Sequence, residues 1–455
     1  MSLEKNLHQY GTKLLLGGAT IGLAVCFCTI HSLNAADQPG DTRVVEAKAT
    51  TGTSSQLALR PLTPGTTTYE TRRGDTVISV ARHYLPQTSY LTSSELAEAI
   101  RGTNANLKGT FLKPGQQLTI PGILDSPVVE RAIPVPKDFE VRAIYLTGIM
   151  AGSDRGLSIA RRWRTAGGNA VVFDIKDSDG QVTIPFEHPL IGPHKIYIHD
   201  LPKYTRFLHS QGLHAIARIA MFRDERLVVS HPELAVKSKK SGQPWRENGK
   251  LVWTDPSRIE VQEYDIALAQ TAARAGADEI QFDYVRCPDA RGVVFSKPNT
   301  RPGRVSAITG FLDEARKALT PYNVFLSADI FGYVSWNIDD THIGQQIEEF
   351  GSRVDYMCLM LYPSGFQFGI PGYRNPVNHP YEIVSLSLRS AAKRTGLPPV
   401  RFRPWLQAFR DYAFGHKQFG GKEIRSQIDA ADKFGSDGWM LWNPRNVYSE
   451  AGLKK

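Results

Sequence analysis

Apolar runs of strand length alternate with segments of helical periodicity throughout the chain from Val141 onward. This alternation predicts a parallel sheet whose strands are joined by crossover helices. The expected strands are Val141–Ile149, Ala170–Lys176, His214–Met221, Glu279–Val285, Val324–Phe331, Tyr356–Tyr362, Arg401–Phe409 and Gly438–Trp442. Eight strands in roughly 310 residues fit an α/β fold, a (β/α)8 TIM barrel with long loops. A doubly wound open sheet is the alternative, although no Gly-rich phosphate-binding turn follows the first strand.

A shorter pattern of strand, helix, helix and strand precedes the barrel, between residues 68 and 121. Asp75 and Thr76 are suitable N-caps for a first helix, and Ser94 begins a second. The segment Leu112–Pro121 contains a Pro-Gly turn followed by a closing strand. We therefore expect a small independent module here.

The N-terminus has the pattern of an export segment. Lys5 and Lys13 precede an apolar run from Leu14 to Ile30, and small residues near Ala35 offer a cleavage site. The run is roughly 17 residues long, which is near the lower limit for a membrane span. A cleaved signal peptide and a retained inner-membrane anchor both remain open. Either predicts export to the periplasm or cell envelope.

Two stretches without hydrophobic periodicity separate these parts. Residues 37–65 are rich in Thr, Ser, Ala and Gly, which predicts a flexible tether. Residues 123–140 are rich in Pro, which predicts a stiffer linker. The predicted organisation is a signal or anchor at 1–36, a linker at 37–65, the small module at 66–122, a Pro-rich linker at 123–140 and the barrel at 141–455.

Charge and cysteine content narrow the partners. The 455 residues include 54 Lys and Arg against 45 Asp and Glu, a net charge of +9 that favours anionic surroundings such as an envelope or nucleic acid. Export and the lack of any nucleic-acid-binding motif disfavour nucleic acid. The four cysteines have no metal-binding spacing, so we expect neither a metal nor a cofactor.

Polar residues gather near the C-terminal ends of the predicted strands, where aliphatic side chains would be usual. Counting every second residue places them on one face, with Asp174 beside Lys176 and Gln281 beside Asp283. The residues are Asp174, Lys176, Arg218, Gln281, Asp283, Asp329 and Gln407. Burying charges is costly unless they are paired or functional, so the pattern indicates an active site at the barrel mouth.

The strongest candidates for catalysis are Asp283 and Asp329, which end neighbouring predicted strands. Two adjacent carboxylates suit glycoside cleavage, in which one protonates the leaving oxygen and the other attacks or positions water. A structural ion pair between Asp174 and Lys176, with Arg218 in the same network, is an equally good interpretation of those residues.

Further residues near the mouth are expected to contact sugar. The candidates for substrate binding are Arg286, Tyr362, Trp442 and Asn443, and Trp245, Trp253 and Trp336 offer further rings for stacking. The segment between Phe222 and Pro256 is long for a connection of this kind, which predicts a cleft wall or lid.

The small module, with GDT at its start and LKPGQQLTIP at its end, resembles a LysM domain. LysM domains bind glycans that contain N-acetylglucosamine, such as peptidoglycan and chitin. The resemblance implies that the sugar lies against Gly74, Asp75 and Thr76 and against the loop of Asn106, Leu107 and Lys108. The alternative interpretation is that the first three residues cap a helix.

The barrel region also resembles a known family. The motifs VVFDIKD, HPELAV, DEIQFDYVRCP, MLYPSGF, RPWLQAF and GWMLWNP occur in order, as in a bacterial family of glycoside hydrolase TIM-barrel domains of uncertain function. A more distant similarity to alpha-amylase-like enzymes implies Asp283 as nucleophile and Asp329 as acid/base, with Asp in place of the usual Glu. Gly365 and Ala408 stand where the family pattern leads us to expect His and Asp.

Together these features predict an exported glycoside hydrolase, of the retaining type, that acts on an envelope or extracellular polysaccharide. Asp174, Lys176, Arg218 and Gln407 would orient the sugar. A non-catalytic glycan-binding scaffold is the rival that Gly365 and Ala408 favour. A transglycosidase is a third possibility, which the residues do not separate from a hydrolase.

Overall fold

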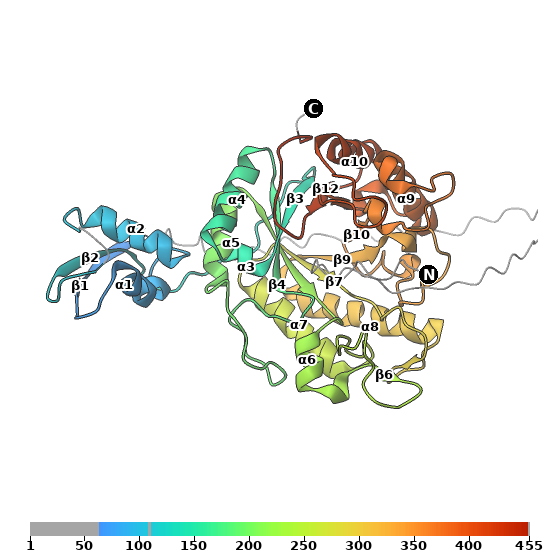
Figure 1. Cartoon of the computed structure of the whole chain (residues 1–455), viewed down its shortest axis with the longest axis horizontal. Helices are drawn as coiled ribbons and strands as arrows, with labels where there is room; N and C mark the ends of the chain where they lie inside the picture. Colours follow the sequence, from blue (N-terminus) through green and yellow to red (C-terminus); the bar gives the residue numbers. More distant parts are fainter. Residues whose placement is uncertain (1–62, 108–110, 454–455) are drawn as a thin grey trace, which may run out of the picture. The chain divides into compact units, whose positions relative to one another are not determined.

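Eight parallel strands close into a barrel in a computed structural model that describes residues 63–107 and 111–453 (Figure 1). The strands are β3 (Val141–Leu146), β4 (Ala170–Lys176), β5 (His214–Ala220), β7 (Glu279–Asp283), β9 (Phe325–Phe331), β10 (Tyr356–Met360), β11 (Trp405–Gln407) and β12 (Gly438–Trp442). Each pairs with the next in chain order, and β12 closes the ring against β3. The predicted TIM barrel is confirmed, and the open-sheet alternative is wrong.

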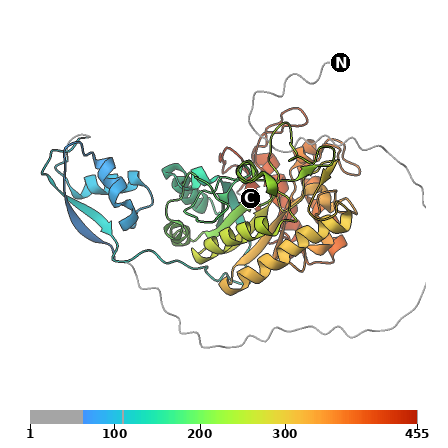
Figure 2. The ribbon, with the colours of Figure 1, turned by 90° about the horizontal axis from the view of Figure 1, so that it is seen from below.

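Amphipathic helices cover the outside of the barrel (Figure 1). They are α4 (Asp154–Thr165), α5 (Leu201–Ser210), α7 (Ile259–Arg274), α8 (Arg301–Leu319), α9 (Pro380–Thr395) and α10 (Gly421–Phe434). Two short helices, α3 (Gly148–Ala151) and α6 (Glu225–Ser230), and a small antiparallel pair, β6 (Lys237–Ser238) with β8 (Val293–Val294), lie in the loops. The helices α7 and α8 run side by side (Figure 2).

Short 3-10 turns complete the connections between strands and helices. They are η1 (Leu85–Gln87), η2 (Pro232–Leu234), η3 (Thr320–Tyr322), η4 (Gly332–Ser335), η5 (Ile347–Glu349), η6 (Pro363–Gly365), η7 (Pro376–Asn378) and η8 (Pro399–Arg401).

The barrel interior contains polar groups at several levels along β7. Glu279 begins this strand and pairs with Arg403, with 2.5 Å between Oε2 and Nη1. Gln281, two residues on, donates from Nε2 to the sulfur atoms of Cys358 and Met440, both at 3.5 Å. These sulfur atoms belong to strands across the barrel, so the alternate residues of β7 face inward. Asp283, the last residue of β7, is the third of these inward-facing residues.

The small module has the predicted strand–helix–helix–strand order. Its strands β1 (Gly65–Glu70) and β2 (Gln117–Ile123) are antiparallel, and between them lie α1 (Val77–Tyr84) and α2 (Ser93–Thr103). The Thr76 hydroxyl caps α1, accepting from the Ser79 N–H at 3.1 Å. The module has its own apolar core, which includes Val80, Leu96, Ala97, Ile100, Leu118 and Ile120.

The chain between the module and the barrel is partly bound to the barrel. Arg206 on α5 donates from Nε to Glu130 at 2.9 Å and from Nη2 to the Val129 carbonyl at 2.6 Å. The Ile133 N–H donates to Asp278, directly before β7, at 2.6 Å. Residues 129–133 therefore lie where β7 begins, at the N-terminal end of the barrel.

No helix within the described residues is long and apolar enough to cross a membrane. The predicted export segment, including residues 14–30, lies outside the described residues, as does most of the predicted tether at 37–65.

Candidate active site

One buried arginine organises the C-terminal mouth of the barrel. Arg218 on β5 donates from Nη1 to Asp174 of β4. Its Nη2 and Nε lie 2.5 and 3.2 Å from Oδ2 of Asp283 on β7. The same Nε lies 4.0 Å from Oδ2 of Asp329 on β9. We call these four residues the mouth cluster. Four neighbouring strands bring three acids to one guanidinium, as the inward faces of the predicted strands implied.

The backbone after Asp283 fixes the orientation of its carboxylate. Tyr284 adopts a left-handed conformation with φ of 51°, which is unusual for an aromatic residue. This turn directs the Tyr284 N–H to Oδ1 of Asp283 at 2.6 Å, while Arg218 binds Oδ2. The Asp283 side chain is 9% exposed, against 1% for each of the other two acids. Asp283 is therefore the acid of the mouth cluster that is most accessible to a substrate.

Asp329 is the acid of the mouth cluster that favours the protonated form. Burial and the nearby Asp283 charge raise its pKa well above the ordinary value, although Arg218 opposes the rise. The Trp405 indole donates to its Oδ1 at 2.7 Å and holds the carboxyl group in place. A protonated carboxyl beside an accessible carboxylate is the arrangement that general acid catalysis requires.

Asp174 anchors the far side of Arg218. Its second oxygen accepts a hydrogen bond from the Tyr145 hydroxyl, and burial raises its pKa to about 6. The Tyr145 ring stacks on Trp442 with 3.9 Å between ring centres, and Trp442 also lies 5.1 Å from the Arg218 guanidinium. Tyr145 was not among the predicted site residues. The available signal was a tyrosine on the inward face of the apolar strand VRAIYL.

Lys176 does not share a face with Asp174, and this expectation was wrong. A register shift between the two residues interrupts the pairing of β4 with β5. The Lys176 ammonium instead contacts Asp224 at 2.8 Å and Asp265 of α7 at 2.7 Å, and the side chain is fully buried. The alternative of an Asp174–Lys176 ion pair is wrong as well, because the partner of Asp174 is Arg218.

The side-chain amides of three predicted binding residues make hydrogen bonds within the protein. Gln281 lies deep in the barrel beside sulfur atoms. Gln407 accepts from the Ser364 N–H at 3.0 Å and donates to its hydroxyl at 2.8 Å. Asn443 donates to the Ala408 carbonyl at 2.6 Å. Contact with sugar by these residues stays a prediction.

The predicted aromatic residues divide into two groups. Tyr362 lies at the mouth near Asp283 and Asp329, whose charges, together with burial as the larger cause, raise its pKa. Trp442 is partly exposed and stacks on Tyr145. Trp253, by contrast, is 2% exposed and belongs to the hydrophobic core, so its predicted role as an exposed stacking ring was wrong.

The sequence from residue 143 to 448, about two thirds of the chain, matches the family described as "Putative glycosyl hydrolase domain". The chain belongs to this glycosyl hydrolase family. Residues 69–121 match the LysM domain. Both resemblances that the motifs indicated are thereby confirmed.

Several solved structures are similar to this glycosyl hydrolase chain. The PgaB (BpsB) glycoside hydrolase domain from Bordetella bronchiseptica is 15% identical, with 68% of this chain and 95% of that chain covered and a TM-score of 0.53. A hypothetical protein from Ruminiclostridium thermocellum is 38% identical over 41% of this chain and 96% of its own, with a TM-score of 0.37. The spore cortex-lytic enzyme SleL of Bacillus cereus is 15% identical, covering 85% and 84%, with a TM-score of 0.43. The first similarity supports the barrel fold. None of the curated proteins matches the sequence.

The LysM module presents a rigid loop at its predicted glycan site. Gly74 has a φ of 93°, a conformation that favours glycine. Asp75 accepts hydrogen bonds from the Arg72 N–H and the Tyr69 hydroxyl, both at 2.7 Å. The capping interpretation is correct for Thr76, whereas Asp75 accepts from residues that precede the helix, and a glycan-binding role stays open.

The second predicted LysM loop is only partly described. Asn106 and Leu107 follow α2, and Leu107 packs against the core of the module. Lys108 lies outside the described residues. The next described residue, Phe111, is bridged to Thr76 and is 77% exposed. An exposed aromatic ring therefore lies beside the first loop.

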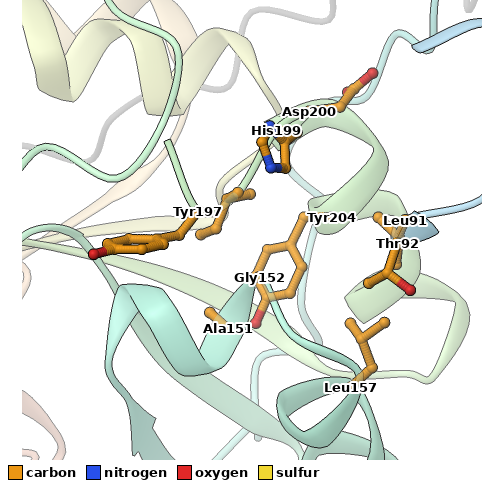
Figure 3. Close-up of a pocket in the computed structure, with 10 residues that line it drawn as sticks. Leu91, Thr92, Ala151, Gly152, Leu157, Tyr197, His199, Asp200 and Tyr204 are labelled. Atoms are coloured by element: carbon orange, nitrogen blue, oxygen red, sulfur yellow. The ribbon is translucent and has the colours of Figure 1, made fainter. Parts of the chain in front are cut away.

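A small pocket elsewhere is lined by Tyr197, His199, Asp200 and Tyr204 together with other residues (Figure 3). None of its lining residues belongs to the mouth cluster, and Asp200 is the single acid among them. Within the described parts of the chain, no group of three or more His, Cys, Asp or Glu side chains could hold a metal ion.

Proposed function

We propose that this protein is an exported glycoside hydrolase that cleaves a cell-envelope or extracellular polysaccharide. The observation that carries the proposal is the pair of acids at the ends of β7 and β9. One is accessible and held by Arg218, and the other is enclosed with a raised pKa. Membership of the glycosyl hydrolase family supports the same reaction class.

We propose a retaining mechanism of two displacements. Asp283 attacks the anomeric carbon and forms the glycosyl–enzyme bond, while Asp329 gives its proton to the departing glycosidic oxygen. Asp329 then takes a proton from water, which attacks the same carbon and releases Asp283. Arg218 aligns the Asp283 carboxylate, and Asp174 with Tyr145 holds Arg218 in place.

The LysM module adds a second contact with the substrate. We propose that it holds the enzyme to glycan that contains N-acetylglucosamine, such as peptidoglycan, through the Gly74–Thr76 loop. The net charge of +9 would favour an anionic envelope polymer, and the apolar run at 14–30 would direct export, with the inner membrane as a further partner if it is retained.

The test is product analysis with matched variants. The chain is incubated separately with peptidoglycan, chitin oligomers and acidic exopolysaccharide, and products are identified by mass spectrometry. We expect Asp283→Asn to lower turnover by at least about 1000-fold, because a nucleophile is lost. Glu314→Gln makes a matched loss of charge on α8, where the side chain is 57% exposed, and should leave turnover unchanged. Unchanged cleavage by Asp283→Asn would overturn the assignment.

Gly365 and Ala408 favour a second candidate, a glycan-binding scaffold without catalysis. A Cβ atom added at Gly365 would meet no neighbouring atom closer than 3.7 Å, so the fold itself does not require glycine at this position. The scaffold predicts glycan binding without products in wild type and Asp283→Asn alike. A transglycosidase would instead yield products longer than the starting oligosaccharide.

A further inference from the structure

Arg286, three residues after Asp283, is a buried cation without an acidic partner. It is 3% exposed, and its Nη1 donates to the Cys287 carbonyl at 3.0 Å. Its Nη2 is enclosed and has no hydrogen-bond partner. Among the residues that the structure describes, no carboxylate lies within ion-pair distance of this guanidinium, although Asp283, Glu247 and Asp289 are close enough to influence its pKa.

The other buried arginines of the barrel differ in this respect. Arg218 contacts Asp283 at 2.5 Å, Arg304 contacts Asp340 at 2.7 Å, and Arg403 contacts Glu279 at 2.5 Å. An unpaired buried charge is strongly destabilising, and stacking on aromatic rings offsets only part of that loss. The folded protein alone therefore does not account for the charge of Arg286.

Two cations approach the same aromatic ring beside Asp283. The Arg286 guanidinium lies 5.5 Å from the ring centre of Tyr284 and 4.7 Å from that of Trp253. The Arg223 guanidinium lies 5.8 Å from Tyr284. The acid that pairs with Arg223 is Asp179, at 3.4 Å, and its side chain is mostly exposed to solvent. Tyr284 itself is partly exposed, so a ligand can reach the ring against which the two guanidinium groups lie.

We propose that Arg286 and Arg223 form a subsite, next to Asp283, for a negatively charged group of the glycan. The ligand is the carboxylate of an acidic sugar, whose two oxygens match the paired N–H groups of a guanidinium. The inference rests on the proposed function, because it names the substrate class of the same site. Arg286 Nη2 is covered in the free protein, so binding includes a shift of the Trp253 side chain that packs on it.

The charge of the ligand can be tested without cleavage. The full chain carrying Asp283→Asn is titrated with a hexamer of galacturonic acid and with its methyl ester, which has the same size and no charge. Calorimetry measures affinity. The chain has seven tryptophans, so the shift of Trp253 is measured as the part of the fluorescence change that is lost in Trp253→Phe. We expect the acid to bind about 10- to 100-fold more tightly than the ester, and higher salt to weaken only the acid.

Variants then test whether Arg286 and Arg223 are the cations that bind the acidic sugar. Arg286→Gln and Arg223→Gln should each remove most of the preference for the acid, and Arg286→Lys should keep part of it. Arg246→Gln makes the same charge change on an exposed residue of the neighbouring loop and should change nothing. Circular dichroism confirms that each variant is folded.

Three outcomes are decisive. Equal affinity for acid and ester overturns the subsite, and so does a preference that survives Arg286→Gln and Arg223→Gln together. A preference for the acid, together with a wild-type chain that releases no product from any of the glycans, supports the subsite while the proposed hydrolase activity fails. The two proposals are therefore separable.

Discussion

Two buried ionic clusters occupy opposite ends of the same barrel, and they differ in charge balance. The mouth cluster sets three acids around Arg218. The floor cluster, at the N-terminal end, consists of Arg403 with Glu279 and Asp437, and of His214 at 3.4 Å from Glu279. In the floor cluster, Arg403 contacts both Glu279 and Asp437, and His214 gives Glu279 a second basic partner. The mouth cluster has an excess of negative charge.

This difference in balance shifts the pKa of the enclosed acids in opposite directions, whereas burial raises the pKa of Asp437, the more exposed acid of the floor cluster. In the floor cluster, Arg403 and His214 outweigh burial and lower the pKa of Glu279 to about 2. In the mouth cluster, burial outweighs Arg218 and raises the pKa of Asp174 to about 6, and that of Asp329 well above its ordinary value. Two equally enclosed carboxylates, Asp174 and Glu279, thus have pKa values shifted in opposite directions, according to how many cations they share.

The largest expected effect on stability comes from removing the floor cation. Arg403→Met leaves Glu279 buried without its main partner, so the free energy of unfolding should fall by about 3–5 kcal/mol. Urea unfolding measures the change. The double variant Glu279→Gln with Arg403→Met should recover part of the loss, since neither charge remains. Wild-type stability in the single variant would contradict a structural role for the floor cluster.

The corresponding change in the mouth cluster should affect turnover and spare the fold. Asp329→Asn should lower turnover by about 100- to 10,000-fold, because the proton donor is lost. Its free energy of unfolding should be equal to or above that of wild type, because the variant removes an acid that lies near Asp283. Turnover and urea unfolding are measured on the same preparations. A large loss of stability in Asp329→Asn with intact turnover would show that the mouth cluster is structural and not catalytic.

The two clusters should respond to pH in opposite directions. Asp174 has a raised pKa when folded, so its contribution to stability is complete below about pH 4 and is lost as the pH rises through about 6. Glu279 has a lowered pKa, so its contribution is present above about pH 4.5 and is lost as the pH falls towards 2. Asp174→Asn should therefore flatten the stability profile between about pH 4 and 6, by about 1–3 kcal/mol.

In the same profile, Glu279→Gln should flatten only the region below about pH 4.5. Thermal unfolding across pH measures both variants. If the stability of Asp174→Asn depended on pH in the same way as that of wild type, the raised pKa that we assign to Asp174 would be contradicted.

Turnover should depend on the Tyr145 hydroxyl, which donates a hydrogen bond to Asp174 of the mouth cluster. Tyr145→Phe removes the hydrogen bond to Asp174 and keeps the ring that stacks on Trp442. We expect about a 10-fold loss of turnover, comparable to the loss of one hydrogen bond to a charged group. That bond lowers the pKa of Asp174, so the pKa should rise in the variant. Tyr204→Phe is the control, because that buried hydroxyl has no partner.

The smallest effect is expected where the connecting segment meets the barrel floor. Glu130→Gln weakens the contacts with Arg206 at 2.9 Å and with His209 at 3.5 Å. The free energy of unfolding should fall by about 1 kcal/mol, and turnover on a soluble oligosaccharide should not change. Hydrogen exchange at the Ile133 amide should become faster. Lower turnover in this variant would show that the floor and the mouth are coupled.

The mouth acids could be predicted because two simple regularities apply to them. Side chains alternate along a strand, and parallel barrel strands present their C-terminal ends on one side. Asp174, Arg218, Asp283 and Asp329 follow both rules, so their convergence needed only the strand boundaries. Lys176 broke the first rule, because a register shift turns the chain between it and Asp174.

Other parts of the site depend on contacts between residues distant in sequence. Tyr145 and Trp405 reach the mouth acids from β3 and β11, and neither has a local pattern that separates it from a core aromatic residue. Trp253 has the surroundings of an exposed loop ring, yet the long segment around it folds over the barrel and buries it.

The sequence by itself determined the order of the elements, the LysM module, the barrel and the strands that carry the acids. These features follow from periodicity and motifs, which are local properties of the chain. Only the tertiary structure decided which acids share a cation, which are enclosed and which arginine stays unpaired. Those properties depend on distance and on exclusion of water, and both arise only when separate strands and loops pack together.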